Sequence, residues 1–114
     1  MEGIMLGSGK RVWIFSEITD MRKGYDGLYA LCRKSGFDVL AGDLFLFISR
    51  DMKQAKVLFW DGTGLRILMK RMEKHRFARI FDRGEMTYAE LDLFMDGAKL
   101  LVKVNLPERE KYSA

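Results

Sequence analysis

The stretch LFLFISRDMKQAKVLFWDGTGL, residues 44–65, decides the fold that we expect for this chain. Leu44–Ile48 is unbroken apolar sequence, which is typical of a central strand covered on both faces. The polar residues 50–54 predict a loop, and residues 56–60 return as the neighbouring antiparallel strand. Asp61–Gly62 then predicts a two-residue hairpin turn of type I′, because such a turn needs a positive φ at both central residues.

Residues 65–72, which follow the turn, fit two kinds of element. Alternation places Leu65, Ile67 and Met69 on one face of a strand, whereas the apolar residues also recur at helical spacing. The preceding hairpin turn favours the strand. Residues 75–81 predict a fourth pairing strand.

Two helices are expected to flank these strands. Residues 10–16, rich in aromatic and β-branched side chains, predict a first strand. A helix over residues 21–35 follows, with Thr19 or Asp20 as its cap and Gly36 at its end. Glycines at two positions weaken the first half of this helix, which favours a later start.

The second helix has a sharper beginning. Thr87 and Glu90 have the spacing of a capping box, and the helix is expected to end near Gly97. Residues 99–106 alternate between apolar and polar and predict a half-buried strand, followed by a frayed tail over 107–114. The predicted fold class is therefore α+β: one domain over residues 1–106, with a single antiparallel sheet of about four to five strands packed by two helices.

Composition excludes several classes of protein. The chain has 114 residues, of which 48% are hydrophobic and 32% charged, so a single domain with a real core is expected rather than disorder. Its longest apolar run is far shorter than the ~20 residues of a membrane span, and its start does not resemble a secretory signal. Cys32 is the single cysteine, which excludes an internal disulfide. We expect a cytoplasmic protein.

Groups that could carry out chemistry are few. His75 is the single histidine and is expected in an exposed turn, and Cys32 is expected to be a buried thiol, so no zinc site is indicated. Asp20, Asp26 and Asp61 are candidate Mg²⁺ ligands, but each has a simpler explanation as a helix cap, an ion pair with Arg22 or a turn residue. The sequence therefore indicates binding rather than catalysis, with no metal and no cofactor.

The strongest remaining signal is a basic stripe. Residues 66–83 hold seven basic and two acidic side chains, a composition that suits a polyanion or simply a solvated face. Phe77 and Phe81 are interleaved with these charges, either as base-stacking groups or as core. The predicted nucleic-acid-binding residues are Arg66, Lys70, Arg71, Lys74, Arg76 and Arg79.

Four blocks of the sequence carry a family resemblance: TDMRKGYDGL (19–28), LFLF (44–47), KVLFWDGTGL (56–65) and KRMEKHRF (70–77). In this order they resemble the TnpB-type accessory protein, the second open reading frame, of bacterial insertion-sequence family sixty-six. The resemblance covers roughly residues 10–98. This sequence departs from the family pattern after the Arg-Phe pair at 76–77, where many members continue with Trp-Pro. The family-motif residues, whose role the resemblance leaves open, are Asp20, Arg22, Lys23, Trp60, Asp61, Gly62 and Gly64.

The resemblance implies a non-enzymatic accessory protein in transposition, with catalysis left to the separate DDE-type transposase of the same element. Two functions stay open at this point. The domain binds element DNA, or the transposase–DNA complex, through its basic hairpin; or it is an interaction module that contacts the transposase without binding nucleic acid. An excess of positive charge suits an acidic protein surface as well as phosphate.

Overall fold

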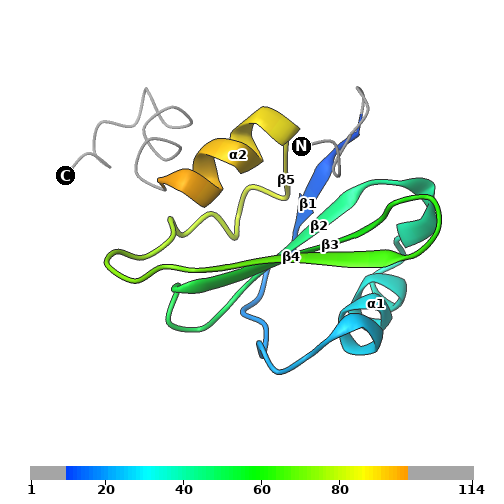
Figure 1. Cartoon of the computed structure of the whole chain (residues 1–114), viewed down its shortest axis with the longest axis horizontal. Helices are drawn as coiled ribbons and strands as arrows, with labels where there is room; N and C mark the ends of the chain where they lie inside the picture. Colours follow the sequence, from blue (N-terminus) through cyan, green and yellow to red (C-terminus); the bar gives the residue numbers. More distant parts are fainter. Residues whose placement is uncertain (1–9, 98–114) are drawn as a thin grey trace.

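The computed structural model describes residues 10–97 and confirms an α+β fold with one five-stranded sheet and two helices. The strand order is β4-β3-β2-β1-β5, and α1 and α2 cover opposite faces of the sheet (Figure 1). The elements are β1 (Val12–Ile14), α1 (Tyr25–Lys34), the short 3-10 helix η2 (Val39–Ala41), β2 (Leu44–Ile48), β3 (Gln54–Trp60), β4 (Leu65–Arg71), β5 (Glu85–Met86) and α2 (Tyr88–Asp96).

The sheet is mostly antiparallel, as expected, with one parallel pair. β1 lies parallel to β2, with Val12 opposite Leu44 and Ile14 opposite Leu46. The physical reason is the connection between them, because α1 forms a crossover that returns the chain to the end of the sheet where β1 began. The sheet is therefore mixed, and its remaining pairs β1–β5, β2–β3 and β3–β4 are antiparallel.

The hairpin of β3 and β4 confirms the strand interpretation of the ambiguous segment, but its turn is longer than predicted. Trp60 pairs with Leu65, which leaves the four residues 61–64 in the turn. Only Gly62 among them has a positive φ, at 107°. The Asp61 carboxylate accepts hydrogen bonds from the amides of the next residues, and this side-chain acceptor stabilises a wider turn than type I′.

The strand predicted over residues 75–81 is wrong. This part of the chain is irregular, and the Phe77 amide donates to the carbonyl of Met52 at 2.7 Å. Phe77 and Ile80 point into the core, so their apolar character serves packing rather than pairing. The further strand of the sheet is instead the short β5 beside β1.

The observed helix termini agree in part with those predicted from the sequence. α1 begins at Tyr25, later than residue 21, and its N-cap is Gly24 without a side-chain hydrogen bond, so the predicted capping by Thr19 or Asp20 is wrong. Gly36, with φ at 88°, follows its end as expected. The capping box of α2 is confirmed in both directions, and α2 ends before Gly97.

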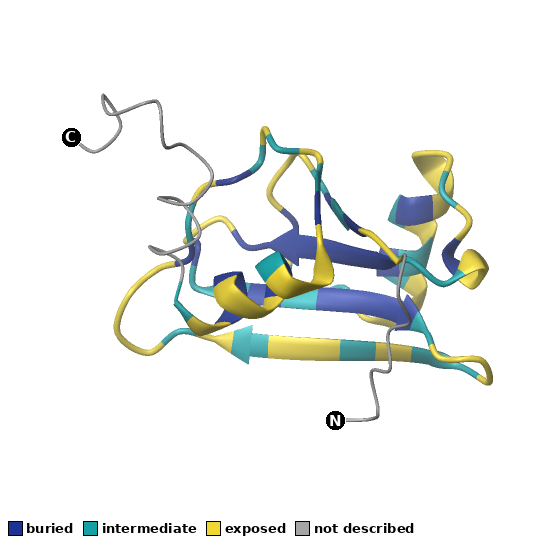
Figure 2. Cartoon of the chain, turned by 90° about the horizontal axis from the view of Figure 1, so that it is seen from above, coloured by how far each residue is buried: buried dark blue, intermediate teal, exposed yellow. Residues whose placement is uncertain are grey.

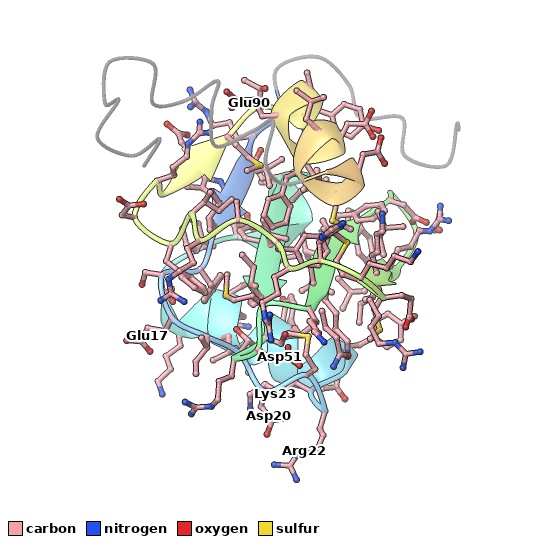
Figure 3. The ribbon with its side chains drawn as sticks, turned by 90° about the vertical axis from the view of Figure 1, so that its left-hand side faces the viewer. Glu17, Asp20, Arg22, Lys23, Asp51 and Glu90 are labelled. Atoms are coloured by element: carbon pink, nitrogen blue, oxygen red, sulfur yellow. The ribbon has the colours of Figure 1, made fainter. Side chains whose placement is uncertain are left out.

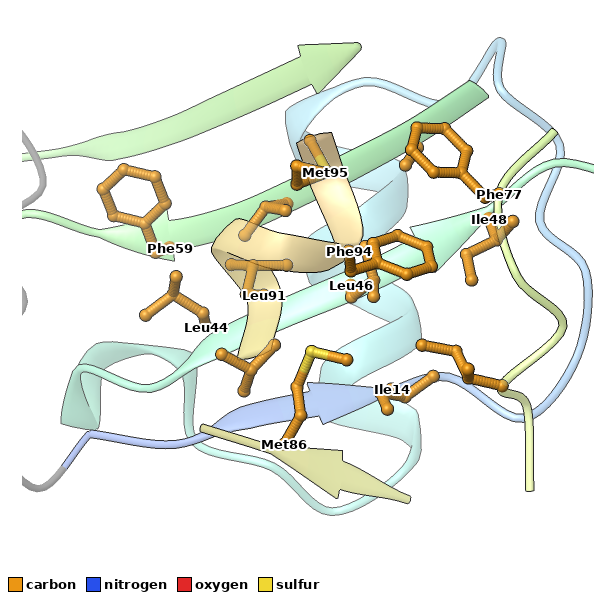
Figure 4. Close-up of a cluster of buried hydrophobic side chains, with 14 of the residues drawn as sticks. Ile14, Leu44, Leu46, Ile48, Phe59, Phe77, Met86, Leu91, Phe94 and Met95 are labelled. Carbon is orange, nitrogen blue, oxygen red and sulfur yellow. The ribbon is translucent and has the colours of Figure 1, made fainter. Parts of the chain in front are cut away.

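Apolar side chains pack on both faces of the sheet. On the α2 face, the Phe77 and Phe94 rings stack with their centroids 4.8 Å apart among buried aliphatic residues (Figure 4). On the α1 face, Leu28 and Cys32 pack against Phe45 and Phe47. All five residues of β2 are buried, which confirms the predicted central strand, whereas the outer strand β4 is half-buried or exposed throughout (Figure 2).

The predicted strand over residues 99–106 and the tail over 107–114 lie outside the described residues. The predicted domain boundary at residue 106 therefore stays a prediction. Within residues 10–97, no helix has the length and apolar character needed to cross a membrane.

Candidate nucleic-acid interface

Three chain segments meet at the end of the sheet where β2 leaves and β3 enters. Residues 17–24 lie beside β2, where the Thr19 amide donates to the Ile48 carbonyl at 2.9 Å. Residues 71–77 lie beside residues 49–54, where the Met72 amide donates to the Lys53 carbonyl at 2.7 Å. We call this region the cationic end. Its basic residues are Arg22, Lys23, Arg50, Lys53, Arg71, Lys74 and Arg76, and its carboxylates are Glu17, Asp20, Asp51 and Glu73.

One lysine positions the first of these segments. Lys56 on β3 donates from Nζ to the backbone carbonyls of Met21 and Lys23, at 2.9 and 2.8 Å. This charged donor holds the loop before α1 against the sheet, and Figure 3 shows Asp20, Arg22, Lys23 and Asp51 at the same end of the molecule.

Arg22 is displayed by this loop. Its guanidinium donates a hydrogen bond from Nη2 to Asp20 Oδ2 at 2.6 Å, and its side chain is 90% exposed. The hydrogen bonds from Arg22 hold the pKa of the Asp20 carboxyl well below its usual range. Asp20 therefore stays ionised and orients Arg22, and the predicted pair between Arg22 and Asp26 does not form.

The second segment is a turn whose carboxylate is used internally. The Ser49 hydroxyl donates to Asp51 Oδ1 at 2.7 Å, and the Lys53 amide donates to the same oxygen at 3.0 Å. These bonds lower the pKa of the Asp51 carboxyl. Met52 sits in the turn with φ at 63° and its side chain buried. Arg76 Nε, from the third segment, donates to the Asp51 carbonyl at 3.1 Å and so ties the two segments together.

An open hollow of about 600 Å³ lies between the first two segments. Its two carboxylates already accept the hydrogen bonds described above, and Arg50 is the cation on its rim. In the part of the chain that the structure describes, no three His, Cys, Asp or Glu residues converge as metal ligands. The hollow is lined by Ile18, Thr19, Asp20, Met21, Ser49, Arg50, Asp51 and Gln54.

Comparison with known proteins places the chain in a family. The sequence profile described as IS66 Orf2 like protein matches residues 10–104. The chain belongs to this family. Membership supports a role as an accessory protein in transposition. No solved structure matches the chain significantly.

Two relatives come from Sinorhizobium fredii (strain NBRC 101917 / NGR234). The chain is 30% identical over 70 residues to uncharacterized protein y4jC, an alignment that covers 60% of each chain. It is 38% identical over 76 residues to uncharacterized protein y4hO, which covers 64% of this chain and 66% of the relative. The matched region thus spans less than two thirds of either relative.

The basic stripe predicted from the sequence is not one surface. Arg71, Lys74 and Arg76 lie at the cationic end, where Arg71 also pairs with Glu73 at 2.9 Å. Lys70 instead donates from Nζ to the Met95 carbonyl at 2.7 Å, at the carboxyl end of α2.

The other two predicted cations lie outside the three segments that define the cationic end. Arg66 is near the hairpin turn, with Nε 3.9 Å from Asp61 Oδ2 and its guanidinium 5.8 Å from the Phe59 ring centre. Arg79 lies over the Phe81 ring at 5.6 Å. Consecutive residues of β4 advance ~3.3 Å each, so Arg66 and Arg71 are roughly 17 Å apart along the strand.

The interleaved aromatic residues are core, which was one of the two alternatives. Phe77 is buried, and the half-buried Phe81 packs against the same cluster. The residues that sequence reasoning missed are Arg50 and Lys53. Their signal was the polar loop between two adjacent predicted strands, which places charged side chains at one end of the sheet.

The second block of family-motif residues forms the hairpin turn. Asp61 Oδ1 accepts from the Thr63 and Gly64 amides at 2.9 and 3.0 Å, and these bonds lower the pKa of the Asp61 carboxyl. Trp60 is half-buried against the α1-side cluster, and Gly62 supplies the positive φ. This block is thus accounted for by turn geometry and packing.

The single histidine and the single cysteine of the sequence lie where they were expected. His75 is exposed, outside any helix or strand. Cys32 is fully buried, and burial raises the pKa of its thiol to about 12. Such a thiol is protonated at neutral pH and is a poor nucleophile.

Proposed function

We propose that this chain is a non-enzymatic, cytoplasmic accessory protein of transposition that binds element DNA, or the transposase–DNA complex, through its cationic end. The DDE-type transposase of the same element then carries out the chemistry. The observation that supports DNA binding is the convergence of seven basic side chains from three segments that are far apart in sequence. Family membership supports the accessory role.

The charges at the cationic end are available to an anion. Two of its carboxylates, Asp20 and Asp51, accept hydrogen bonds within their own loops, and seven basic side chains against four carboxylates leave this end with a net charge of +3. Within residues 10–97, no carboxylate forms an ion pair with Arg50, Lys53 or Lys74. The surface crosses four strands at ~4.8 Å spacing, or roughly 14 Å, and duplex DNA carries one charge per ~1.7 Å.

A surface of this kind favours the DNA backbone over its bases. Contacts to phosphates fix the position of a protein on a duplex but read no sequence. We therefore expect similar affinity for the terminal repeats of the element and for unrelated duplexes, with the choice of sequence left to the transposase.

The test is a mobility-shift titration on terminal repeats and on an unrelated duplex, over a range of salt, with and without transposase. Log affinity should fall linearly with log salt, with a slope near −0.9 per phosphate contacted. The double variant R22A/R50A removes two exposed cations beside the hollow. It should weaken binding about equally for both duplexes and reduce the slope by roughly two units.

The matched control is R66A/R79A, which removes the same charge from the basic stretch of sequence but not from the cationic end. Its affinity should stay close to wild type. The proposal is wrong if this control loses binding while R22A/R50A retains it. If wild type shows no salt-sensitive binding, the alternative function applies, and R22A/R50A should then fail to pull down transposase.

A further inference from the structure

β4 is an edge strand that carries exposed apolar side chains. Within residues 10–97, no strand pairs with its outer edge. Leu68 and Met69 are 41% and 48% exposed, on opposite faces of the strand. A regular edge with free backbone groups and apolar side chains is a template for another strand, and proteins usually cover such edges.

The register identifies the backbone groups that face outward. The Met72 amide points toward β3, because it donates to the Lys53 carbonyl. Backbone direction alternates along an antiparallel strand, so Leu68 also points its amide toward β3. The amides of Ile67 and Met69 consequently point away from β3, toward the open edge.

The chain leaves α2 beside this edge. Lys70 of β4 donates to the Met95 carbonyl in the last turn of α2, so the helix ends over the carboxyl-terminal half of β4. The family match continues beyond Gly97 to residue 104. The sequence that follows, Lys99-Leu-Leu-Val-Lys-Val-Asn-Leu106, has the alternation of a strand and is stopped by Pro107.

We propose that residues 99–106 of this chain pair antiparallel with β4 as a sixth strand, with Val102 opposite Leu68. The direction follows from the exit of the chain near Lys70, since the segment must then run toward Leu65. Residues 96–98 can span about 10 Å, enough to descend from the helix to the sheet edge.

Apolar contacts support this register, which also places one like-charged pair, Lys99 opposite Arg71, at the end of the strand pair. It places Leu100 opposite Lys70 and Val104 opposite Arg66, so each of these cations faces an aliphatic side chain. It also lets Val102 cover the exposed Leu68 on the α2 face. A second copy fits less well, because symmetric pairing about Leu68 would create two like-charged pairs within the strand, Arg66 of each copy opposite Lys70 of the other, and like charges directly opposite are destabilising.

Amide hydrogen exchange on the full chain, read by NMR, tests the pairing. The Ile67 and Met69 amides should exchange as slowly as the Leu68 amide, which is bonded to β3 in either case. Lys103→Pro removes a donor that would bond the Ile67 carbonyl, and it should accelerate exchange at Ile67 and Met69 by about tenfold or more. Val102→Pro is the matched control, because the amide of Val102 would face away from β4 and proline is tolerated there.

Cross-linking then identifies the occupant. In the variant L68C/V102C the two Cα atoms would be ~4.5 Å apart, within disulfide range. The buried, protonated Cys32 does not compete. An intrachain disulfide in the monomer is expected. Fast exchange at Ile67 and Met69 in wild type, a cross-linked dimer, or protection that appears only when transposase is added would each overturn the proposal.

Discussion

The two blocks of family-motif residues lie at opposite ends of β3 and are built differently. At the hairpin turn, the Asp61 carboxylate accepts hydrogen bonds from the amides of Thr63 and Gly64, so the polar group of this block is used within the turn itself. At the cationic end, Asp20 instead orients Arg22, whose side chain is 90% exposed. The block at the hairpin turn is therefore explained by the fold, whereas the block at the cationic end presents a charged group to solvent.

The largest effect should come from the lysine that connects the sheet to the first block. Lys56→Met leaves the carbonyls of Met21 and Lys23 without their charged donor, and we expect a loss of about 1–3 kcal/mol in the free energy of unfolding. DNA affinity should fall as well, because the loop that displays Arg22 loosens. Urea denaturation measures the first effect; equal stability of this variant and the control Lys34→Met would contradict it.

A smaller effect is expected at the hairpin turn. Gly62→Val forces a β-branched residue to adopt φ near 107°, where no atom would crowd its Cβ, so the cost is backbone strain of about 1–2 kcal/mol. Gly64→Ala, with open space and no positive φ, should change stability by less than about 0.5 kcal/mol. DNA affinity should stay unchanged in both variants, and a loss in Gly62→Val would show that the two blocks cooperate.

The smallest effect concerns acid. The pKa of Asp61 in the folded chain lies below the unfolded value near 3.8, so its stabilising contribution is complete above about pH 4 and is lost as pH falls further. Asp61→Asn keeps a side-chain acceptor without this titration. Thermal unfolding between pH 5 and pH 3 should therefore show a shallower decline for the variant than for wild type; identical declines would mean that the carboxylate does not stabilise the turn through its charge.

Local signals explain what the sequence could predict. The apolar run of β2 and the capping box of Thr87 and Glu90 depend on residues within a few positions of one another, and both were found where expected. The β3–β4 pair followed from alternation and a turn. Each of these features depends only on residues that are close together in the sequence.

Distant contacts explain what was missed. The parallel pairing of β1 with β2 depends on how α1 returns the chain. Phe77 and Ile80 resembled a strand in the sequence because burial in the core requires the same apolar side chains as a buried strand. The cationic end is likewise invisible in linear order, because Arg22, Arg50 and Arg76 meet only once the sheet has formed. The fold separates basic residues that are close together in the sequence and brings together basic residues that are far apart in it.

Met52 shows a conflict that limits how this turn can be redesigned. Its φ of 63° suits glycine, whereas its side chain is 5% exposed and fills part of the core. Glycine would relieve about 1 kcal/mol of backbone strain but would give up roughly 2–3 kcal/mol of buried methionine side chain. The usual route to a stabler turn, replacing a left-handed residue by glycine, therefore works against the protein here. Unbranched apolar side chains are the substitutions that this position should accept.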